Sequence, residues 1–441
     1  MARRRHARRT RANRAWLALL TALSSPFVVA HDDEGTAARL DRDAVIARAR
    51  AHAPMVLDAL ADDARARAGL VEAERLSAQN PSLQGRAGPR FAPEGVLPDG
   101  ELMLYVPVPL VVDRMRAVDA ARADIAAREA DIERARLVAS SMAETLYIDV
   151  LHATAVCALA DERHELSRAL VATSEAREQA GASSLLDVEL ARTERALAEA
   201  EGHAARARRE AATHALARAL DLPTLAPDDV VGALALPSRA SAEEPVVDES
   251  EHPSVIAARA EAARARSLRA KAALAWLPSV SLGAGYAYEE GGHIPSVALQ
   301  ATLPVFERGQ GERARAEVEQ TVRAREAERT ARALVIDVER ARAADAHAYE
   351  AARALDQGAV LHATRALALA DVAYAAGKSD VVALLAVRRH ALAVRAEHLA
   401  RVRDAAQADV DLALALGITA RSTRAAQEET SGARRSSEEE R

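Results

Sequence analysis

The chain has 441 residues, of which 50% are apolar and 28% are charged, but it contains only 2 Trp, 6 Tyr and 3 Phe. Its core must therefore be built from Ala, Leu and Val, a composition that favours long, closely packed helices and argues against a β-sandwich enzyme or a mainly β receptor. The formal net charge is −6, and the single Cys157 excludes a disulfide framework and a multi-cysteine zinc or iron–sulfur site.

Residues 1–30 have the organisation of a secretory signal peptide. Seven Arg and no acidic residue precede an uncharged run from Ala15 to Ala30, which ends on the small-residue pattern Val28-Val29-Ala30. A basic start, a short apolar stretch and a small-residue cleavage pattern are the three parts of such a signal. The run is shorter than the roughly 20 apolar residues of a spanning helix, and a signal anchor or a lone membrane helix is the alternative interpretation. No Cys follows the expected cleavage point, so we do not expect a lipid anchor there.

The rest of the chain contains the same order of motifs twice, about 195–199 residues apart. The matching pairs are His52-Ala53-Pro54 and His252-Pro253, Asn80-Pro81-Ser82-Leu83 and Leu277-Pro278-Ser279-Val280, Pro109 and Pro304, Ala180-Gly181-Ala182-Ser183 and Ala376-Gly377-Lys378-Ser379, and Leu220-Asp221-Leu222 and Leu416-Gly417-Ile418. Matches in one order at near-constant spacing predict two structural repeats, over 31–223 and 251–419. A linker over 224–250 joins them, and a tail over 420–441, rich in Ser, Glu and Arg, is expected to be disordered.

Each repeat is expected to contain a helix, a β-hairpin, a long helix and a return helix, in that order. In the first repeat these elements are predicted over roughly 41–78, 80–109, 113–178 and 184–220, and in the second over 251–275, 278–304, 311–375 and 380–416. At 1.5 Å per residue each long helix spans about 100 Å and each return helix about 55 Å. The first helix of a repeat is therefore expected to complete the length, end to end with the return helix.

A stripe of branched and long apolar residues in the first long helix predicts a coiled-coil-like seam. Its members are Val118, Ile125, Ile132, Val138, Met142 and Leu146. Alanine is expected to let the neighbouring helices approach closely along this seam.

The second predicted hairpin alternates in the way of a transmembrane β-strand. The residues on its apolar face are Val280, Leu282, Ala284, Tyr286 and Tyr288, followed by Val297, Leu299, Ala301 and Leu303, with small or polar residues between them. The first hairpin shows the pattern less clearly, because Pro89, Arg90 and Pro107 interrupt it. A solvated hairpin that caps a helical domain is the alternative. Four strands cannot close a barrel, and an open sheet edge is untenable in hydrocarbon, so strands in lipid require several copies of the chain.

Over about residues 40–419 the chain resembles the TolC-like outer-membrane factors of bacterial efflux and type I secretion systems. The resemblance rests on the strand entries at Pro81 and Pro278, on Pro109 and Pro304 before the long helices, and on two turn motifs. These motifs are Gly181-Ala182-Ser183-Ser184-Leu185-Leu186-Asp187-Val188 and Gly377-Lys378-Ser379-Asp380-Val381-Val382-Ala383-Leu384. The Asn-Pro-x-Leu form and the compact first hairpin are similar to the CzcC-like metal-efflux branch.

This resemblance implies a mainly α fold with a small β part, in which long helical hairpins form a trimeric α-barrel. Each chain would add four strands to a twelve-strand transmembrane β-barrel in the outer membrane, with the helices extending into the periplasm. The homotrimer would be a passive exit duct, and its partners would be a periplasmic adaptor (membrane fusion) protein, an inner-membrane pump and outer-membrane lipid. The family implies no enzyme activity, no cofactor and no metal site.

The resemblance also places the periplasmic tip, which contacts the adaptor or forms the gate, at the two turn motifs. The candidate residues are Gly181, Ser184, Leu185, Asp187, Gly377, Ser379 and Asp380. A ring of three Asp187 carboxylates would attract cations. The alternative is that Asp187 only stabilises the first turn of its helix. In the second repeat Ala383 stands at the position that matches Asp187.

Other functions have less support in the sequence. Outside residues 1–30, 52 basic residues are interleaved with 65 acidic ones, so we expect no nucleic-acid partner. The chain has no Gly-x-Ser-x-Gly, P-loop or His-Glu-x-x-His motif. Cys157 is interpreted as a packed residue, His390 and His398 lack an acidic third ligand, and Trp276 marks either a membrane interface or the core. The main alternative function is a periplasmic coiled-coil scaffold or adaptor without a membrane barrel.

Overall fold

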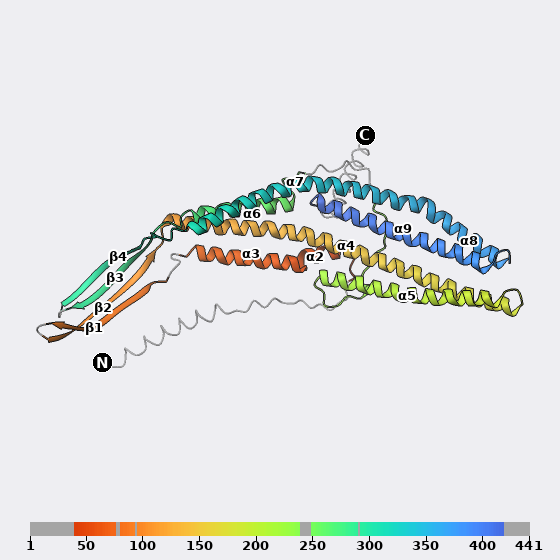
Figure 1. Cartoon of the computed structure of the whole chain (residues 1–441), viewed down its shortest axis with the longest axis horizontal. Coiled ribbons are helices and arrows are strands. Elements are labelled where there is room, and N and C mark those ends of the chain that lie inside the picture. Colours follow the sequence, from red (N-terminus) through yellow and green to blue (C-terminus); the bar gives the residue numbers. More distant parts are fainter. Residues whose placement is uncertain (1–38, 76–79, 93–94, 239–247, 290–291, 419–441) are drawn as a thin grey trace, which may run out of the picture. The chain divides into compact units, whose positions relative to one another are not determined.

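The computed structural model describes residues 39–75, 80–92, 95–238, 248–289 and 292–418 (Figure 1). The predicted signal peptide over 1–30, the predicted tail over 420–441 and part of the predicted linker over 224–250 lie outside the described residues. The described residues from Arg39 onward belong to one compact unit.

The first repeat contains four α-helices and two strands. They are α2 (Arg42–His52), α3 (Pro54–Ala73), β1 (Ser82–Ala92), β2 (Gly95–Val108), α4 (Val111–Gln179) and α5 (Leu185–Ala219). The expectation of one helix over 41–78 was wrong, because Pro54 begins a second helix. Proline lacks the N–H that would continue α2, and it is favoured in the first turn of a new helix.

The second repeat follows the same order. It contains α6 (Pro253–Ala272), β3 (Ser279–Glu289), β4 (Gly292–Thr302), α7 (Gln310–Ala354), α8 (Leu361–Ala375) and α9 (Val381–Ala415). A six-residue π-helical segment, η2 (Leu355–Val360), joins α7 to α8. The expected continuous helix over 311–375 therefore needs correction. The wide turn contains Gly358, and glycine weakens an α-helix more than any residue except proline.

The four strands form one antiparallel sheet in the order β1-β2-β3-β4, so the two repeats meet at β2 and β3. Leu104 pairs with Leu83 on one side and with Ala284 on the other, and Ala284 pairs with Val297. Residues that pair directly share a face of the sheet, and this face is exposed and apolar. Its exposed large residues are Leu83, Phe91, Val96, Leu102, Leu104, Val106, Val108, Leu282, Tyr286, Val297 and Leu299.

The opposite face of the sheet carries mainly polar and small residues. Arg86 pairs with Glu101 at 3.2 Å and Arg90 with Asp99 at 3.1 Å. Met103 of β2 also lies on this face, directly over Gly285, where an added Cβ would come within 1.8 Å of the Met103 sulfur. The alternation predicted from the sequence is therefore present as one apolar face and one polar face.

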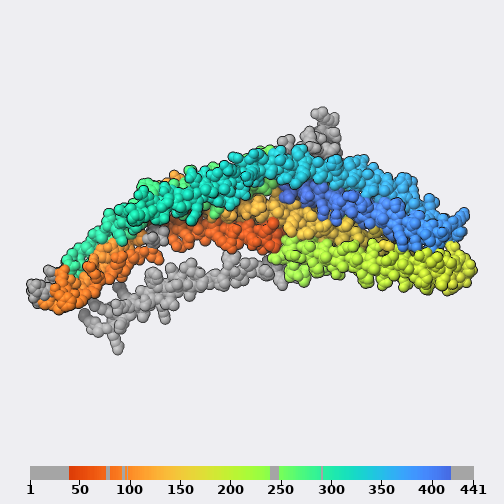
Figure 2. Space-filling model, in the orientation of Figure 1, coloured from red at the N-terminus to blue at the C-terminus, as the bar shows by residue number. Residues whose placement is uncertain are grey.

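Helix α4 is the central helix, and its two halves have different neighbours. In its first half α4 packs against α3, through Ile132, Ala135 and Ala139, and against α6; α7 lies beside α6. In its second half α4 packs against α5 and α9, and Figure 2 shows α4 between these two helices. A stretch of α4 is long and apolar enough to span a membrane. This helix packs against α3, α5, α6 and α9, so it is the central helix of the helical region. The prediction that the first and return helices together complete the length of the long helix is confirmed.

In the first half of α4 the buried seam is made mainly of alanine. Its members from Ala120 to Ala143 are Ala120, Ala127, Ala135, Ala139 and Ala143, together with Ile132, Leu137 and Ser140. The predicted stripe was partly wrong, because Met142 is 54% exposed and Val118 and Ile125 are only half-buried. Small side chains let the neighbouring helices approach α4 closely on two sides. Larger apolar residues such as Met142 therefore lie outside the seam.

Candidate functional site

The two sequence-predicted turns have the same backbone geometry. Gly181 and Gly377 follow α4 and α8 with φ values of +71° and +69°, in the left-handed region that favours glycine. The next N–H groups donate back into the helix, from Ala182 to the Arg177 carbonyl at 2.8 Å and from Lys378 to the Ala373 carbonyl at 2.9 Å. This is a Schellman-type end in both repeats.

The first turn is closed by a capping box between Ser184 and Asp187. Ser184 Oγ accepts a hydrogen bond from the Asp187 N–H at 3.3 Å. Asp187 Oδ2 accepts from the Ser184 N–H at 3.1 Å and from Ser183 Oγ at 2.8 Å. These bonds hold the pKa of the Asp187 carboxyl below its ordinary value. Within one chain, Asp187 therefore stabilises the first turn of its helix, and its part in a gate stays a prediction.

The second turn places its acid three positions earlier. Asp380 is the N-cap residue of α9, and its Oδ1 accepts from the Ala383 N–H at 2.7 Å. Ser379, which precedes it, is half-buried, and its Oγ lies 3.5 Å from the Asp380 carbonyl oxygen. The start of α9 therefore has a side-chain cap from Asp380 without an acidic residue at Ala383, the position that matches Asp187.

Apolar side chains differ in exposure between the two turns. Leu185 and Leu186 begin α5 and are 64% and 66% exposed. In the second repeat Val381, which matches Leu185, is 1% exposed, whereas Val382 is 57% exposed. The first turn therefore presents two adjacent leucines and the second turn one valine.

A buried cluster joins the two helical hairpins close to the turns. Its members are Leu170, Val171, Ala191, Tyr374, Val381, Leu384 and Leu385. The Tyr374 hydroxyl lies 3.3 Å from Ser174 Oγ. Arg177 donates to the Tyr374 carbonyl at 2.8 Å and stacks 4.9 Å from the centroid of its ring. Sequence reasoning missed this contact, because the partners are about 200 residues apart; the scarcity of aromatic residues was the available signal.

Farther from the turns, a buried carboxylate also connects the two helical hairpins. Glu194 of α5 is 5% exposed, and it pairs with Arg163 of α4 at 2.8 Å and with Arg389 of α9 at 2.6 Å. Burial raises the pKa of Glu194, but the hydrogen bonds from Arg389 and Arg163 outweigh burial and lower it. Arg388 also reaches across, to Asp371 at 2.7 Å and to the Leu166 carbonyl at 3.2 Å. The two turns are therefore held together as one unit.

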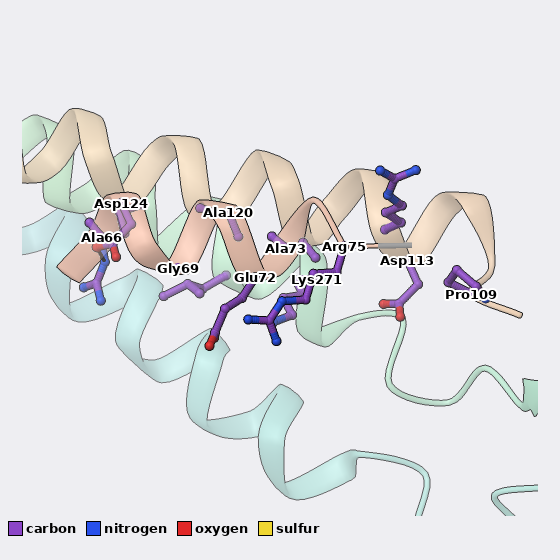
Figure 3. A pocket seen from close by; sticks show the side chains of 15 residues that line it. Ala66, Gly69, Glu72, Ala73, Arg75, Pro109, Asp113, Ala120, Asp124 and Lys271 are labelled. Carbon is purple, nitrogen blue, oxygen red and sulfur yellow. Dashed lines mark ion pairs between the residues drawn. The ribbon is translucent and has the colours of Figure 1, made fainter. Parts of the chain in front are cut away.

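A groove of about 360 Å³ lies near the sheet, between α3, α4 and α6 (Figure 3). Its lining is mixed in charge and includes Glu72, Arg75, Asp113 and Lys271 around small residues. Among the described residues, no three His, Cys, Asp or Glu side chains are placed to hold a metal ion. Cys157 is buried against Ala160 and Ala205, which agrees with its interpretation as a packed residue.

Comparisons with known proteins agree on the fold. The family described as outer membrane efflux protein matches residues 249–418, which cover the second repeat. No curated protein matches the chain. Similar solved structures include the CmeC outer membrane channel of Campylobacter jejuni, at 18% identity and a TM-score of 0.68, covering 85% of this chain and 85% of that chain.

Two further solved structures show the same likeness. The outer membrane protein VceC of Vibrio cholerae is 20% identical with a TM-score of 0.67, covering 86% of this chain and 96% of that chain. The open state of the MtrE outer membrane channel of Neisseria gonorrhoeae is 20% identical with a TM-score of 0.69, covering 86% of this chain and 89% of that chain. The resemblance inferred from the sequence is confirmed, while the CzcC-like branch stays a prediction. Residues 249–418 match the outer membrane efflux protein family, and the described chain has the fold of the TolC-like outer membrane channels.

Proposed function

We propose that the protein is the outer-membrane channel of a tripartite efflux or type I secretion system. Its family and fold are those of passive channels rather than enzymes. As a channel of this kind it lies in the outer membrane, extends into the periplasm and provides an exit duct for cargo that a pump supplies.

The observation that carries this proposal is the sheet. Its four strands present a wide apolar face to the surroundings, and within the described residues β1 and β4 each pair with a strand on one side only. Exposed apolar area of this extent needs lipid or protein to cover it. Unpaired strand edges in hydrocarbon need partner strands, since no water is present to hydrogen-bond them.

Further copies of the same chain can provide the partner strands for both edges of the sheet, and the closed sheet then turns its apolar face to the lipid. If β4 of one copy pairs with β1 of the next, three copies close a twelve-strand barrel. The apolar face then lies outside and the polar face, with Arg86, Glu101, Arg90 and Asp99, lies inside. The helices follow the same order, because α3, α4, α6 and α7 lie side by side below the sheet and leave α3 and α7 at the edges.

The two turns at the far end of α4 and α8 are the proposed contact with a periplasmic adaptor. Leu185, Leu186 and Val382 are exposed there on a backbone that two caps and a buried cluster hold in place. Rigid, exposed apolar residues with a polar surround are the usual anchors of a protein interface. For Asp187 we favour the capping role over the gate, since the first turn itself uses Oδ2 twice.

Fractionation tests the proposal. We expect the protein in outer membranes as a trimer that resists detergent and dissociates on heating. Recovery as a soluble periplasmic monomer would contradict the channel and support the scaffold alternative.

A further inference from the structure

The groove between α3, α4 and α6 presents charges of both signs that are not paired with one another. Among the described residues, its charged side chains without a hydrogen bond or an ion pair are Glu72, Arg75, Asp113 and Lys271. Figure 3 shows these four side chains along the same opening. Two are acidic and two are basic, so the groove as a whole favours neither a simple anion nor a simple cation.

The remaining charged side chains of the groove are engaged and hold its walls. Arg264 of α6 forms an ion pair with Asp124 of α4 at 2.6 Å. Arg114 of α4 donates to the Glu74 carbonyl, just after α3, at 2.7 Å. These contacts connect α4 to the helices on its two sides, so the walls are fixed while the charges at the opening stay available.

The two repeats place opposite charges on the two sides of α4. Glu72 stands 18 residues after Pro54, the first residue of α3, and Lys271 stands 18 residues after Pro253, the first residue of α6. The two positions therefore match between the repeats. A ligand that lies across α4 meets a carboxylate on one side and an ammonium group on the other.

The bed of the groove is made of small apolar residues. Ala117, Ala120 and Ala121 of α4 line it, with Leu268 on the side of α6. Gly69 lies on the side of α3, and a Cβ added there would have no atom within 4 Å, so it would project into open space. A volume of about 360 Å³ suits a small molecule, and a short aliphatic body can lie on this bed with its charged ends at the opening.

The groove opens on the face of α4 that lies opposite to the linker. Tyr147 donates to the Val231 carbonyl at 2.7 Å, so the linker covers the Tyr147 face. Ala117 and Asp124 stand 30 and 23 residues before Tyr147, which places them about 150° around the helix from it at 3.5 residues per turn. A linker inside a helical tube would obstruct the duct. In the proposed channel the linker therefore lies outside, and the groove faces the lumen.

We propose that this groove binds a small zwitterion with a short aliphatic body, an amino acid or a dipeptide, as cargo in the lumen. The ammonium group of the ligand lies against Glu72 and Asp113, and its carboxylate lies against Arg75 and Lys271. The inference rests on the proposed channel function. It adds one cargo site per chain, in the helical part of the duct near the sheet.

The site is weak, as a duct requires. All four charged side chains are exposed, and water and salt screen exposed ion pairs. A pore conducts only when its sites release a ligand as readily as they bind it. We therefore expect a dissociation constant on the order of millimolar.

Saturation-transfer NMR with the dipeptide alanyl-alanine and the full chain in detergent gives the first test. We expect the wild type to bind alanyl-alanine more tightly than acetate or methylammonium, which each carry one of its charges. Glu72→Gln and Lys271→Gln should each weaken binding about three- to fivefold. Arg332→Gln, at a side chain of α7 that is 74% exposed, should leave binding unchanged. Absence of binding, or binding of acetate as tight as that of alanyl-alanine, would overturn the proposal.

Filling the groove gives a test that does not depend on charge. Gly69→Leu places a side chain in the open space of the groove and should abolish binding, whereas Gly69→Ala adds one methyl group and should keep it. Circular dichroism of the two variants checks that the helices are unchanged. Full binding by a folded Gly69→Leu variant would show that the ligand lies elsewhere and would overturn the proposal.

Single-channel recording tests the position of the site in the lumen. We expect alanyl-alanine to reduce the current of the wild type reversibly and to leave the current of Gly69→Leu unchanged. A pore whose current does not respond to alanyl-alanine would overturn the cargo site and leave the channel function standing. A protein that binds alanyl-alanine in detergent but forms no pore would contradict the channel function, and with it the cargo role of the groove.

Discussion

The two helical turns share one backbone and differ in what their first helical residue does. In both, a left-handed glycine ends the incoming helix, and an acidic side chain accepts a hydrogen bond from a backbone N–H at the start of the outgoing helix. Val381 is then buried in the cluster that joins the hairpins, whereas its counterpart Leu185 is exposed. The two turns therefore have the same backbone geometry but different roles. The second turn contributes Val381 to the buried cluster that joins the hairpins, and the first turn exposes the larger apolar surface.

Substitution in the buried cluster that joins the two hairpins has the largest expected effect on stability. Tyr374→Ala removes a buried ring, its stacking with Arg177 and its hydroxyl contact with Ser174, and we expect a loss of about 3–4 kcal/mol in the free energy of unfolding. Tyr374→Phe keeps the ring and is expected to cost only about 1 kcal/mol. Thermal unfolding followed by circular dichroism compares the two variants. Equal effects would show that the ring does not join the hairpins.

The matched residues Val381 and Leu185 test the division of roles directly. Val381→Ala should lower the free energy of unfolding by about 2 kcal/mol, since the side chain is buried. Leu185→Ala should change stability by less than about 0.5 kcal/mol but weaken binding of the adaptor in a pull-down from membranes. A stability loss at Leu185 as large as that at Val381 would break the comparison.

The glycines test what the two turns share. Gly181→Ala and Gly377→Ala each place a side chain at positive φ, at an expected cost of about 1–2 kcal/mol. No atom lies within 4 Å of an added Cβ at Gly181, and only the end of the Arg177 side chain lies near one at Gly377. The two costs should therefore be equal in thermal unfolding. A clearly larger cost at one position would mean that the turns differ in more than their caps.

The smallest effect concerns Asp187. Its folded-state pKa is lowered by the hydrogen bonds from Ser183 and Ser184, so its contribution to stability is present above the unfolded pKa near 4 and is lost as the pH falls through the folded value. Asp187→Asn should cost about 0.5–1 kcal/mol at pH 7 and remove this pH dependence below about pH 4.

Single-channel recording of Asp187→Ala separates the cap from the gate. The capping role predicts unchanged conductance and unchanged block by cations. Raised conductance or weakened block would instead support the carboxylate ring that the resemblance implies.

Local signals in the sequence predicted most of the fold. Pro109 and Pro304 precede the two long helices, Gly181 and Gly377 end two helices, and the alternation around Leu282 predicted the faces of β3. These features are local because each depends on the φ range or the side-chain period of a few residues.

The features that sequence reasoning missed depend on distant partners. Tyr374 and Ser174 meet across 200 positions, and the alanine seam of α4 is defined by which helices pass on its two sides. The aromatic residues show the difference most clearly. The sequence contains few of them, and the structure places Trp276, Phe306 and Phe91 on the surface at the two ends of the sheet.

Closure of the barrel by β1 and β4 is the central claim, and cysteine cross-linking in outer membranes tests it most directly. Pairs are chosen from Gln84, Arg86 and Gly88 on the polar face of β1 and from Ala298, Gln300 and Thr302 on the polar face of β4, in a Cys157→Ala background. Oxidation of a pair in register should produce covalent dimers and trimers and no larger species, since three copies complete the ring. Absence of cross-links for every pair, or a ladder that continues beyond the trimer, would contradict a closed trimeric barrel.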